Sequence, residues 1–431
     1  MFRWSGASQP EFRLSRFLHQ SIINLLPPPP NMRDMDLDRP LQSRQRRLRI
    51  GIVTETYPPE INGVALTIAR WIEGLRQRDH IVQLVRVRQG ANDHPQATGT
   101  LDILPLPGFR IPGYPQLQGG WPAVRPLLTQ WRRDRPDLVH IVTEGPLGHS
   151  ALRAARRLGI PISTSFHTHF HGYSRHYHLG WLATPIMAYL RHFHNQGAQT
   201  LVPTVELAEQ LQSLGFLRTQ VLARGVDTRL FSPQRRDLAL REAWGATPDA
   251  PVTLYVGRLA AEKNLDLAIT AFRAIRRTQP AARLVLVGDG PLAARLRARH
   301  PEFVYCGMKR GEELAAHYAS ADLFLFPSLT ETFGNVVLEA LASGLAVAAF
   351  DYAAARAQVE PGRNGLLAPF GDVGAFVAAA ATLARDPDAL RRMGQTARQA
   401  MLRLDSERIY DRLETLFLNA ITGEVPCANP C

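Results

Sequence analysis

The feature that most constrains this chain is an alternation of short apolar runs with amphipathic stretches, which occurs twice in succession. A short apolar run bounded by turn residues is typical of a buried strand, and the amphipathic stretch that follows is typical of a helix. Strand–helix alternation predicts a mostly parallel sheet covered by helices. Its repetition predicts an α/β protein with two doubly wound, Rossmann-like domains that face each other across a cleft, where such sheets bind ligands.

The apolar runs give the expected strands of both domains. Those of the first domain are 49–53, 82–87, 101–106, 138–142, 161–166 and 200–203. Those of the second domain are 252–257, 283–287, 303–305, 323–327 and 345–350. Helical patterns fall between most of them, and the last segments, 387–401 and 405–420, are also expected to be helical. They should cover or cross the junction between the domains.

The domain organisation follows from the point where each pattern begins. Residues 1–48 are rich in proline and arginine and predict a disordered basic tail, or alternatively a basic amphipathic membrane tether. Residues 49–219 would form the N-terminal domain, and residues 220–400 the C-terminal domain. Residues 401–421 would form a helix that covers the N-terminal domain or crosses back to it.

The net charge indicates which partners the protein binds, and the number of cysteines indicates the redox state of its compartment. The 431 residues hold 50 Lys and Arg against 38 Asp and Glu, a net charge of +12 that favours anionic partners such as nucleotides, phospholipids or nucleic acid. Three cysteines do not make a disulfide framework, which favours a reducing, cytoplasmic compartment. We expect no secretory signal and no spanning helix. The P-loop and the nucleophile-elbow motif are both missing from the sequence.

The stretch from Ser328 to Glu339 is the most informative local pattern. Glu331 would lie in the loop after a buried strand, and Glu339 inside the helix that follows. Between them, Phe333, Gly334 and Asn335 lead into that helix, whose free N–H groups and dipole suit an anionic or polyhydroxyl ligand. The alternative is an ordinary strand–loop–helix with a solvated glutamate.

Two further loops of the second domain carry candidate phosphate contacts. Arg258 and Lys263 lie in the loop after its first strand, where a guanidinium fork and a point charge could hold a diphosphate. They could equally be two surface cations. Gly288-Asp289-Gly290-Pro291 predicts a tight turn with close backbone approach, but it does not match the dinucleotide fingerprint.

In the first domain, Asn62-Gly63 joins the first strand to the first helix, where Gly63 could approach a phosphate or sugar. His167 ends a strand at the edge where ligands should bind, so we prefer it for chemistry over the neighbouring histidines 169, 171, 176, 178, 192 and 194. These histidines lack zinc-like spacing and nearby cysteines, so we predict no metal site.

Taken together and in this order, the motifs resemble family 4 of the retaining glycosyltransferases, which have the GT-B fold. The resemblance covers about residues 49–420 and is most specific at Glu331–Glu339, a Glu-x7-Glu pattern with Phe-Gly-Asn inside. Gly257-Arg258, Glu262-Lys263-Asn264 and the Gly288–Pro291 turn match further signatures. Asn62 stands where the family commonly has glycine, and asparagine tolerates left-handed backbone.

The resemblance implies a role for each candidate residue. The C-terminal domain would bind a UDP- or GDP-sugar and the N-terminal domain the acceptor. Arg258 and Lys263 would hold the diphosphate, Glu339 the ribose and Glu331 the sugar. His167 would contact the sugar near the reacting carbon and Gly63 the phosphate. Further donor contacts would come from Asn62, Gly257, Asp289, Gly290, Phe333, Gly334 and Asn335. The resemblance implies retention of the anomeric configuration, no assigned nucleophile and no cofactor or divalent metal.

The opening Thr54–Val64 resembles the subgroup that mannosylates or glucosylates lipids. Residues 121–135 mix Trp121, Trp131, Leu127 and Leu128 with four arginines, a pattern typical of an interfacial helix or of a helix packed on the sheet. The sequence thus predicts a hexosyltransferase at the cytoplasmic face of the inner membrane, with a lipid acceptor and an anionic membrane surface as partners. The alternatives are a soluble or polysaccharide acceptor and, remotely, a nucleic-acid-binding protein; no nucleic-acid module is recognisable, so we expect no nucleic acid as partner.

Overall fold

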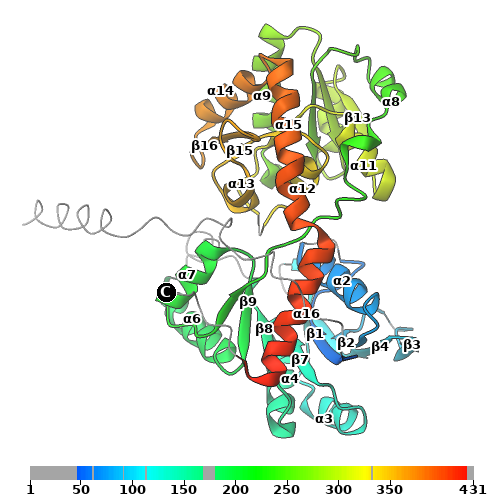
Figure 1. Ribbon diagram of the computed structural model, residues 1–431, viewed down its shortest axis with the longest axis vertical. Coiled ribbons are helices and arrows are strands. Elements are labelled where there is room, and N and C mark those ends of the chain that lie inside the picture. The colour runs from blue at the N-terminus through cyan, green and yellow to red at the C-terminus, as the bar shows by residue number, and fades with distance from the viewer. Residues whose placement is uncertain are drawn as a thin grey trace, which may run out of the picture. The chain divides into compact units, whose positions relative to one another are not determined.

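The computed structural model describes residues 46–60, 63–90, 92–111, 114–167, 180–331 and 333–424 (Figure 1). Residues 1–45 of the expected tail, Asn62 and the histidines between 168 and 179 lie outside the described residues. Both sheets belong to one compact unit, residues 44–431.

The first sheet has eight strands within the described residues, in the order β10-β9-β8-β7-β1-β2-β4-β3. Neighbouring strands are parallel except β3 and β4, which are antiparallel. The bounds are β1 (Arg49–Thr54), β2 (Ile81–Val87), β3 (Gln96–Thr98), β4 (Leu101–Leu106), β7 (Leu138–Ile141), β8 (Ile162–Ser165), β9 (Gln199–Val202) and β10 (Thr219–Val221). The sheet therefore ends just past the boundary expected at residue 219.

The second sheet has six parallel strands within the described residues, in the order β13-β12-β11-β14-β15-β16. Three of them, β11, β14 and β15, are buried along their whole length, as parallel strands covered on both faces should be. The bounds are β11 (Val252–Val256), β12 (Arg283–Val287), β13 (Val304–Gly307), β14 (Leu323–Phe326), β15 (Ala346–Phe350) and β16 (Gly365–Ala368).

Helices connect most of the parallel strands, whereas β2 and β4 are connected through β3 and loops. In the first half they are α2 (Gly63–Arg76), α3 (Val124–Arg133), α4 (Pro146–Leu158), α6 (Gly180–His194) and α7 (Val205–Ser213), with a hairpin of β5 (Gly108–Ile111) and β6 (Tyr114–Gly120). In the second half they are α8 (Leu238–Ala243), α9 (Leu265–Thr278), α10 (Ala293–Arg299), α11 (Gly311–Ala319), α12 (Asn335–Ala342), α13 (Ala353–Gln358), α14 (Val373–Leu383), α15 (Pro387–Met401) and α16 (Ser406–Thr422). Short 3-10 turns are Pro233–Arg235, Ala261–Lys263 and Leu402–Leu404.

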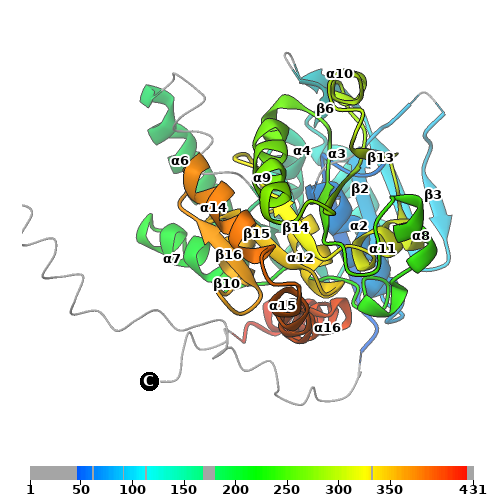
Figure 2. The same cartoon turned by 90° about the horizontal axis from the view of Figure 1, so that it is seen from above.

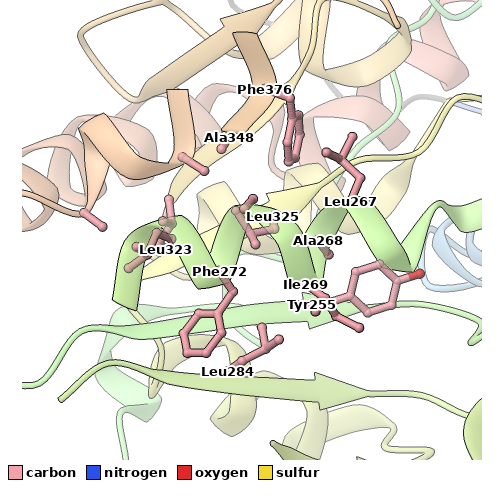
Figure 3. Packing of buried hydrophobic residues seen from close by; sticks show 14 of the residues in the cluster. Tyr255, Leu267, Ala268, Ile269, Phe272, Leu284, Leu323, Leu325, Ala348 and Phe376 are labelled. Atoms are coloured by element: carbon pink, nitrogen blue, oxygen red, sulfur yellow. The ribbon is translucent and has the colours of Figure 1, made fainter. Parts of the chain in front are cut away.

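Alternate residues of the central strands divide the second domain into two packed layers. Leu323 and Leu325 of β14 belong to the core cluster that α9 and α14 cover (Figure 3). The intervening Phe324 points to the opposite layer, where its ring lies 5.8 Å from that of Tyr318 in α11. The view from above shows α9 and α14 on one side of β14 and β15, with α11 and α12 on the other (Figure 2). This alternation follows from the period-2 geometry of a strand.

The last helix returns to the first domain. α16 packs against α2, β7 and β8 (Figure 1). Buried Arg78, just after α2, binds Asp411 at 2.7 Å and Glu407 at 2.9 Å, both in α16. α16 follows the second domain in the chain but packs on the first sheet. It therefore links the two domains.

In each sheet the strand order reverses at one pair of neighbouring parallel strands, so that later strands are added on the opposite side. These pairs are β1 and β7 in the first sheet and β11 and β14 in the second. Connections leave such a pair toward opposite sides, which opens a crevice at the carboxyl ends of the two strands. Residues just after these four strands are therefore the best-placed candidates for ligand binding.

The helix α3 decides between the two alternatives for residues 121–135, in favour of a helix packed against the core of the first domain. Leu127 and Trp131 are fully buried in the core of the first domain, so its apolar side packs inward and is not available to a membrane. The arginines 125, 132 and 133 face outward, and Trp121 is 54% exposed beside Phe109.

The contact between α15 and the end of α12 yields a prediction about stability. A β-carbon at Gly394 in α15 would lie 2.0 Å from the carbonyl oxygen of Gly344. Because that neighbour is backbone, Gly394→Ala should lower the free energy of unfolding by about 1–3 kcal/mol. Urea unfolding measures this as a lower midpoint.

The matched control is Gly374→Ala in α14, where the nearest atom would be the Asp372 Oδ1 at 3.5 Å. This variant should keep or raise the midpoint, since alanine favours a helix over glycine. An unchanged midpoint for Gly394→Ala would show that the helix contact relaxes freely.

Candidate functional site

An ion pair lies at the carboxyl ends of β11 and β14. The Lys263 Nζ is 2.5 Å from the Glu331 Oε1, and the two side chains are only 21% and 16% exposed. The two loops that carry these residues are also hydrogen-bonded to each other, because the Asn264 Nδ2 donates to the carbonyl of Pro327 at 3.3 Å. Two residues 68 positions apart are thus brought together at the reversal point of the second sheet.

The glycine turn after β12 packs directly on the loop after β11. A β-carbon at Gly288 would lie 1.9 Å from the carbonyl oxygen of Gly257, and one at Gly290 would lie 2.5 Å from that of Leu259. The Asp289 Oδ1 accepts from the N–H of Gly290 at 2.7 Å. The turn therefore needs glycine for backbone contact, and the Asp289 carboxylate binds its own turn.

Arg258 lies on the exposed side of the loop. Its side chain is 55% exposed, and its Nη1 is 3.4 Å from the Glu262 Oε1. So loose a surface pair contributes little to stability. The guanidinium is therefore available to a ligand, which its expected role requires.

The start of α12 has the geometry that the sequence predicts. Gly334 has φ 93°, a left-handed conformation that favours glycine, and it precedes Asn335, the first residue of the helix. A β-carbon there would also lie 2.9 Å from the ring of Phe326. Phe333 is buried. The first N–H groups of α12 thus form a positive helix end beside the loop that carries Glu331.

Glu339 is buried one turn into α12, and both of its carboxylate oxygens have partners. The Tyr318 hydroxyl donates to Oε2 at 3.1 Å, and the Arg70 Nη2 lies 3.4 Å from Oε1. Burial raises the pKa of the Glu339 carboxyl above its usual value, against the lowering effect of Arg70 and Tyr318.

On the side of the first domain, His167 follows β8 and Gly63 begins α2. Among the described residues, neither ring nitrogen of His167 has a hydrogen-bond partner, although both are buried. Burial holds the pKa of His167 well below its ordinary value, so the ring is neutral at pH 7. The ring lies 6.3 Å from that of Trp71 in α2.

Arg224 is a central residue that sequence reasoning missed. Its Nη1 lies 3.5 Å from both the Gly63 carbonyl and the Asn335 Oδ1, and its guanidinium stacks on Phe333 at 5.0 Å. Burial lowers its pKa to about 10. In the sequence, Arg224 lies close to the expected domain boundary at residues 219 and 220, and an arginine before glycine there carries no signal of burial.

The bonding of Arg224 differs from that of other buried arginines. Arg86 binds Asp93 and Arg241 binds Asp322, so each has a carboxylate partner. The Nε and Nη2 of Arg224 have no hydrogen-bond partner among the described residues. A buried guanidinium with unmet donors is costly, and a bound anion would satisfy it. A small pocket beside it is lined by Thr67, Arg70, Trp71, Arg224, Gly225, Asn335, Ser406, Ile409 and Tyr410.

The described part of the chain lacks two features. It contains no cluster of three or more His, Cys, Asp or Glu residues that could hold a metal ion. Its helices include none that is both long and apolar enough to cross a membrane.

Family models match both halves of the chain. A model described as "Glycosyltransferase Family 4" matches residues 61–230, and one described as "Glycosyl transferases group 1" matches residues 250–386. The chain is 37% identical to a GDP-mannose-dependent alpha-mannosyltransferase of Mycobacterium tuberculosis, over 75% of this chain and 85% of that protein.

Two further relatives carry lipid names. A GDP-mannose-dependent alpha-(1-6)-phosphatidylinositol dimannoside mannosyltransferase of M. tuberculosis is 30% identical over 69% of this chain and 78% of its own length. An alpha-monoglucosyldiacylglycerol synthase of Streptococcus pneumoniae is 27% identical over 70% and 71%.

Among solved structures, the sucrose-phosphate synthase of Thermosynechococcus elongatus superposes with a TM-score of 0.70 at 18% identity, over 88% of this chain and all of that chain. This likeness confirms the expected GT-B fold. With the family models and relatives it identifies the chain as a member of glycosyltransferase family 4 and a hexosyltransferase.

Proposed function

We propose that this enzyme transfers mannose from GDP-mannose to a lipid acceptor at a membrane surface and retains the anomeric configuration. The observation that carries the proposal is the Lys263–Glu331 pair at the reversal point of the second sheet, beside the N-terminal end of α12. The relatives named for GDP-mannose and for a phosphatidylinositol acceptor support this donor and acceptor class. The relative named for diacylglycerol keeps glucose as the second candidate sugar.

In this proposal the cations act on the diphosphate of the donor. Lys263, Arg258 and buried Arg224 would bind phosphate oxygens, and the helix end at Asn335 would add its dipole. These charges would stabilise the negative charge that the departing GDP gains as the bond from the anomeric carbon to its phosphate oxygen breaks. No divalent metal is needed for that neutralisation.

The remaining groups act on the sugar and the nucleoside. Glu331 would accept from sugar hydroxyls while Lys263 holds its carboxylate in place. Glu339 would accept from the ribose, and neutral His167 would hydrogen-bond the sugar. We assign no enzymic nucleophile: the acceptor oxygen would bond to the anomeric carbon on the face that GDP leaves, and its proton would pass to the departing phosphate. Gly257, Asp289 and Gly290 would shape the loops that hold the donor.

For the membrane, we propose peripheral attachment at the cytoplasmic face through the outward arginines of α3 and exposed Trp121. Basic residues near a bilayer are attracted to anionic headgroups, and an exposed tryptophan suits the interface. The net charge of +12 supports the same partner.

The direct test incubates the enzyme with GDP-mannose, GDP-glucose, UDP-glucose or UDP-galacturonate, each with and without vesicles of diacylglycerol and phosphatidylinositol. We expect GDP release from GDP-mannose, stimulated by vesicles, with mannose in the lipid fraction. NMR of the product should show an α-linkage. Release that ignores vesicles would move the acceptor to a soluble or polysaccharide glycan, and a β-linkage would contradict retention.

Glu331→Gln tests the sugar contact. The variant should reduce kcat by about a hundredfold or more, because it removes the charge that both holds Lys263 and accepts from the sugar. Circular dichroism should stay unchanged. The matched control is Glu313→Gln, which also loses a 2.5 Å contact to a lysine, Lys309, but on the exposed surface. Equal turnover of the two variants would contradict the assignment.

Arg224→Met separates stability from binding. The substitution removes a buried charge with unmet donors, so the melting temperature should stay or rise. Affinity for GDP, measured by calorimetry, should fall about 10- to 100-fold, as expected for lost charge-assisted hydrogen bonds. Exposed Arg363, changed to Gln, is the control. Unchanged affinity in Arg224→Met would show that the guanidinium serves the fold alone.

Replacement of Arg125, Arg132 and Arg133 by Gln tests the membrane surface. Each arginine near an anionic bilayer contributes about 1 kcal/mol, so binding to phosphatidylinositol vesicles should fall at least tenfold in a sedimentation assay. The control replaces the exposed arginines 276, 277 and 299 of the second domain by Gln. A similar loss in both triple variants would point to net charge rather than to α3.

A further inference from the structure

Glu339 is held by two different halves of the protein. Its Oε2 accepts from the Tyr318 hydroxyl in α11 of the second domain. Its Oε1 is contacted by Arg70, which comes from α2 of the first domain, 269 positions away in the chain. The Glu339 side chain is 10% exposed and that of Arg70 is 37% exposed. The first domain thus supplies a counter-ion to a buried carboxylate of the second.

The surroundings of Glu339 make this counter-ion important. Burial favours the neutral acid, and Tyr318 is itself buried and uncharged. The cations at the two ends of α12 are engaged elsewhere: Arg224 lies at Asn335, and the Arg398 of α15 donates to the Ala342 carbonyl at 3.0 Å. Among the described residues, Arg70 is therefore the cation in contact with this carboxylate.

We infer that Arg70 is a positioning residue, which keeps Glu339 ionised and oriented to receive the ribose of the donor nucleotide. The inference rests on the proposed function, in which Glu339 binds the ribose. Both ribose hydroxyls donate most simply to an ionised carboxylate, since a protonated one carries a donor of its own. The ribose site is then complete only when α2 lies against α12.

The position of Arg70 also couples the two ends of the nucleotide. α2 begins at Gly63, which the family resemblance places near the phosphate, and Arg70 lies two turns further along the same helix. One rigid helix would therefore approach the phosphate with its first residue, and from its middle would contact the Glu339 carboxylate that binds the ribose.

The test measures GDP and UDP binding by calorimetry from pH 5.5 to 8.5 in the wild type, Arg70→Met and Arg70→Lys, and follows the tighter ligand. Without Arg70, the pKa of Glu339 should rise further, because the nearby positive charge that lowers it is gone. Arg70→Met should therefore bind several-fold more weakly than wild type at pH 5.5, and the deficit should shrink as the pH rises to 8.5 and the Glu339 carboxyl ionises in both proteins. Arg70→Lys keeps the charge and should restore most of the wild-type profile.

The nucleotide phosphate also ionises in this pH range. Comparison of each variant with wild type at the same pH cancels its effect on the measured affinity. The control on the same helix is Arg76→Met, which loses a surface pair with Glu73 and a hydrogen bond to Thr100 but no contact with the second domain among the described residues. A loss of equal size at every pH, tighter binding in Arg70→Met, or a profile like that of wild type would each overturn the inference.

Glu339→Gln separates this inference from the proposed function. The amide cannot ionise, so its affinity should be low and should no longer follow the titration of residue 339. Wild-type affinity in Glu339→Gln would overturn the proposed ribose site, and the inference with it. Weak binding in Glu339→Gln together with a wild-type profile in Arg70→Met would overturn the role of Arg70 alone.

Discussion

The pairing of Lys263 with Glu331 is the interaction on which the candidate site depends. β11 and β14 are neighbours in the second sheet although β12 and β13 lie between them in the chain, so their loops meet at one edge. Mostly desolvated ions are tolerated when each has its counter-ion. The pair therefore fixes the relative position of the two loops, and with them the start of α12. A ligand that binds here meets a site whose charges are already held in place.

Charge is balanced locally around this edge except at one position. Lys263 faces Glu331, Arg70 faces Glu339 and Arg258 loosely faces Glu262. Arg224 is buried among Gly63, Phe333 and Asn335, and none of the carboxylates that the structure describes is in contact with it. An excess of one buried cation in a polar crevice is what a site for a dianionic or more highly charged ligand requires, because the ligand supplies the missing negative charge.

The sequence predicted those parts of the fold that carry a local pattern. Runs such as Val252–Val256 and Leu323–Phe326 are continuous and apolar, and their strands were expected at nearly the observed bounds. Two of the elements that the sequence did not predict lack such a pattern. The hairpin 108–120 is rich in glycine, and the helix Val373–Leu383 consists almost entirely of small and apolar residues, without a polar face.

The site shows the same division between local and tertiary information. Lys263 and Glu331 were predictable because both follow strands at the ligand edge, and sheet order brings them together. Arg70 and Arg224 were not, because their significance lies in burial and in partners more than a hundred positions away. Asp289 was expected at the donor, whereas its carboxylate accepts a hydrogen bond from its own turn. The roles assigned to individual residues stay predictions.

The two crossings between the domains explain why donor binding and domain arrangement should be linked. The chain crosses first near Val226 and returns near Leu404, and the two crossings are bonded to each other: the Val226 N–H donates to Leu404, and the Ser406 N–H donates to Val226, both at 3.0 Å. Arg398 adds hydrogen bonds to the carbonyls of Thr228 and Phe231. Beyond this point α16 is fixed to α2 through Arg78. A change in how α2 meets α12 must therefore be absorbed at the paired crossings, which lie next to Arg224.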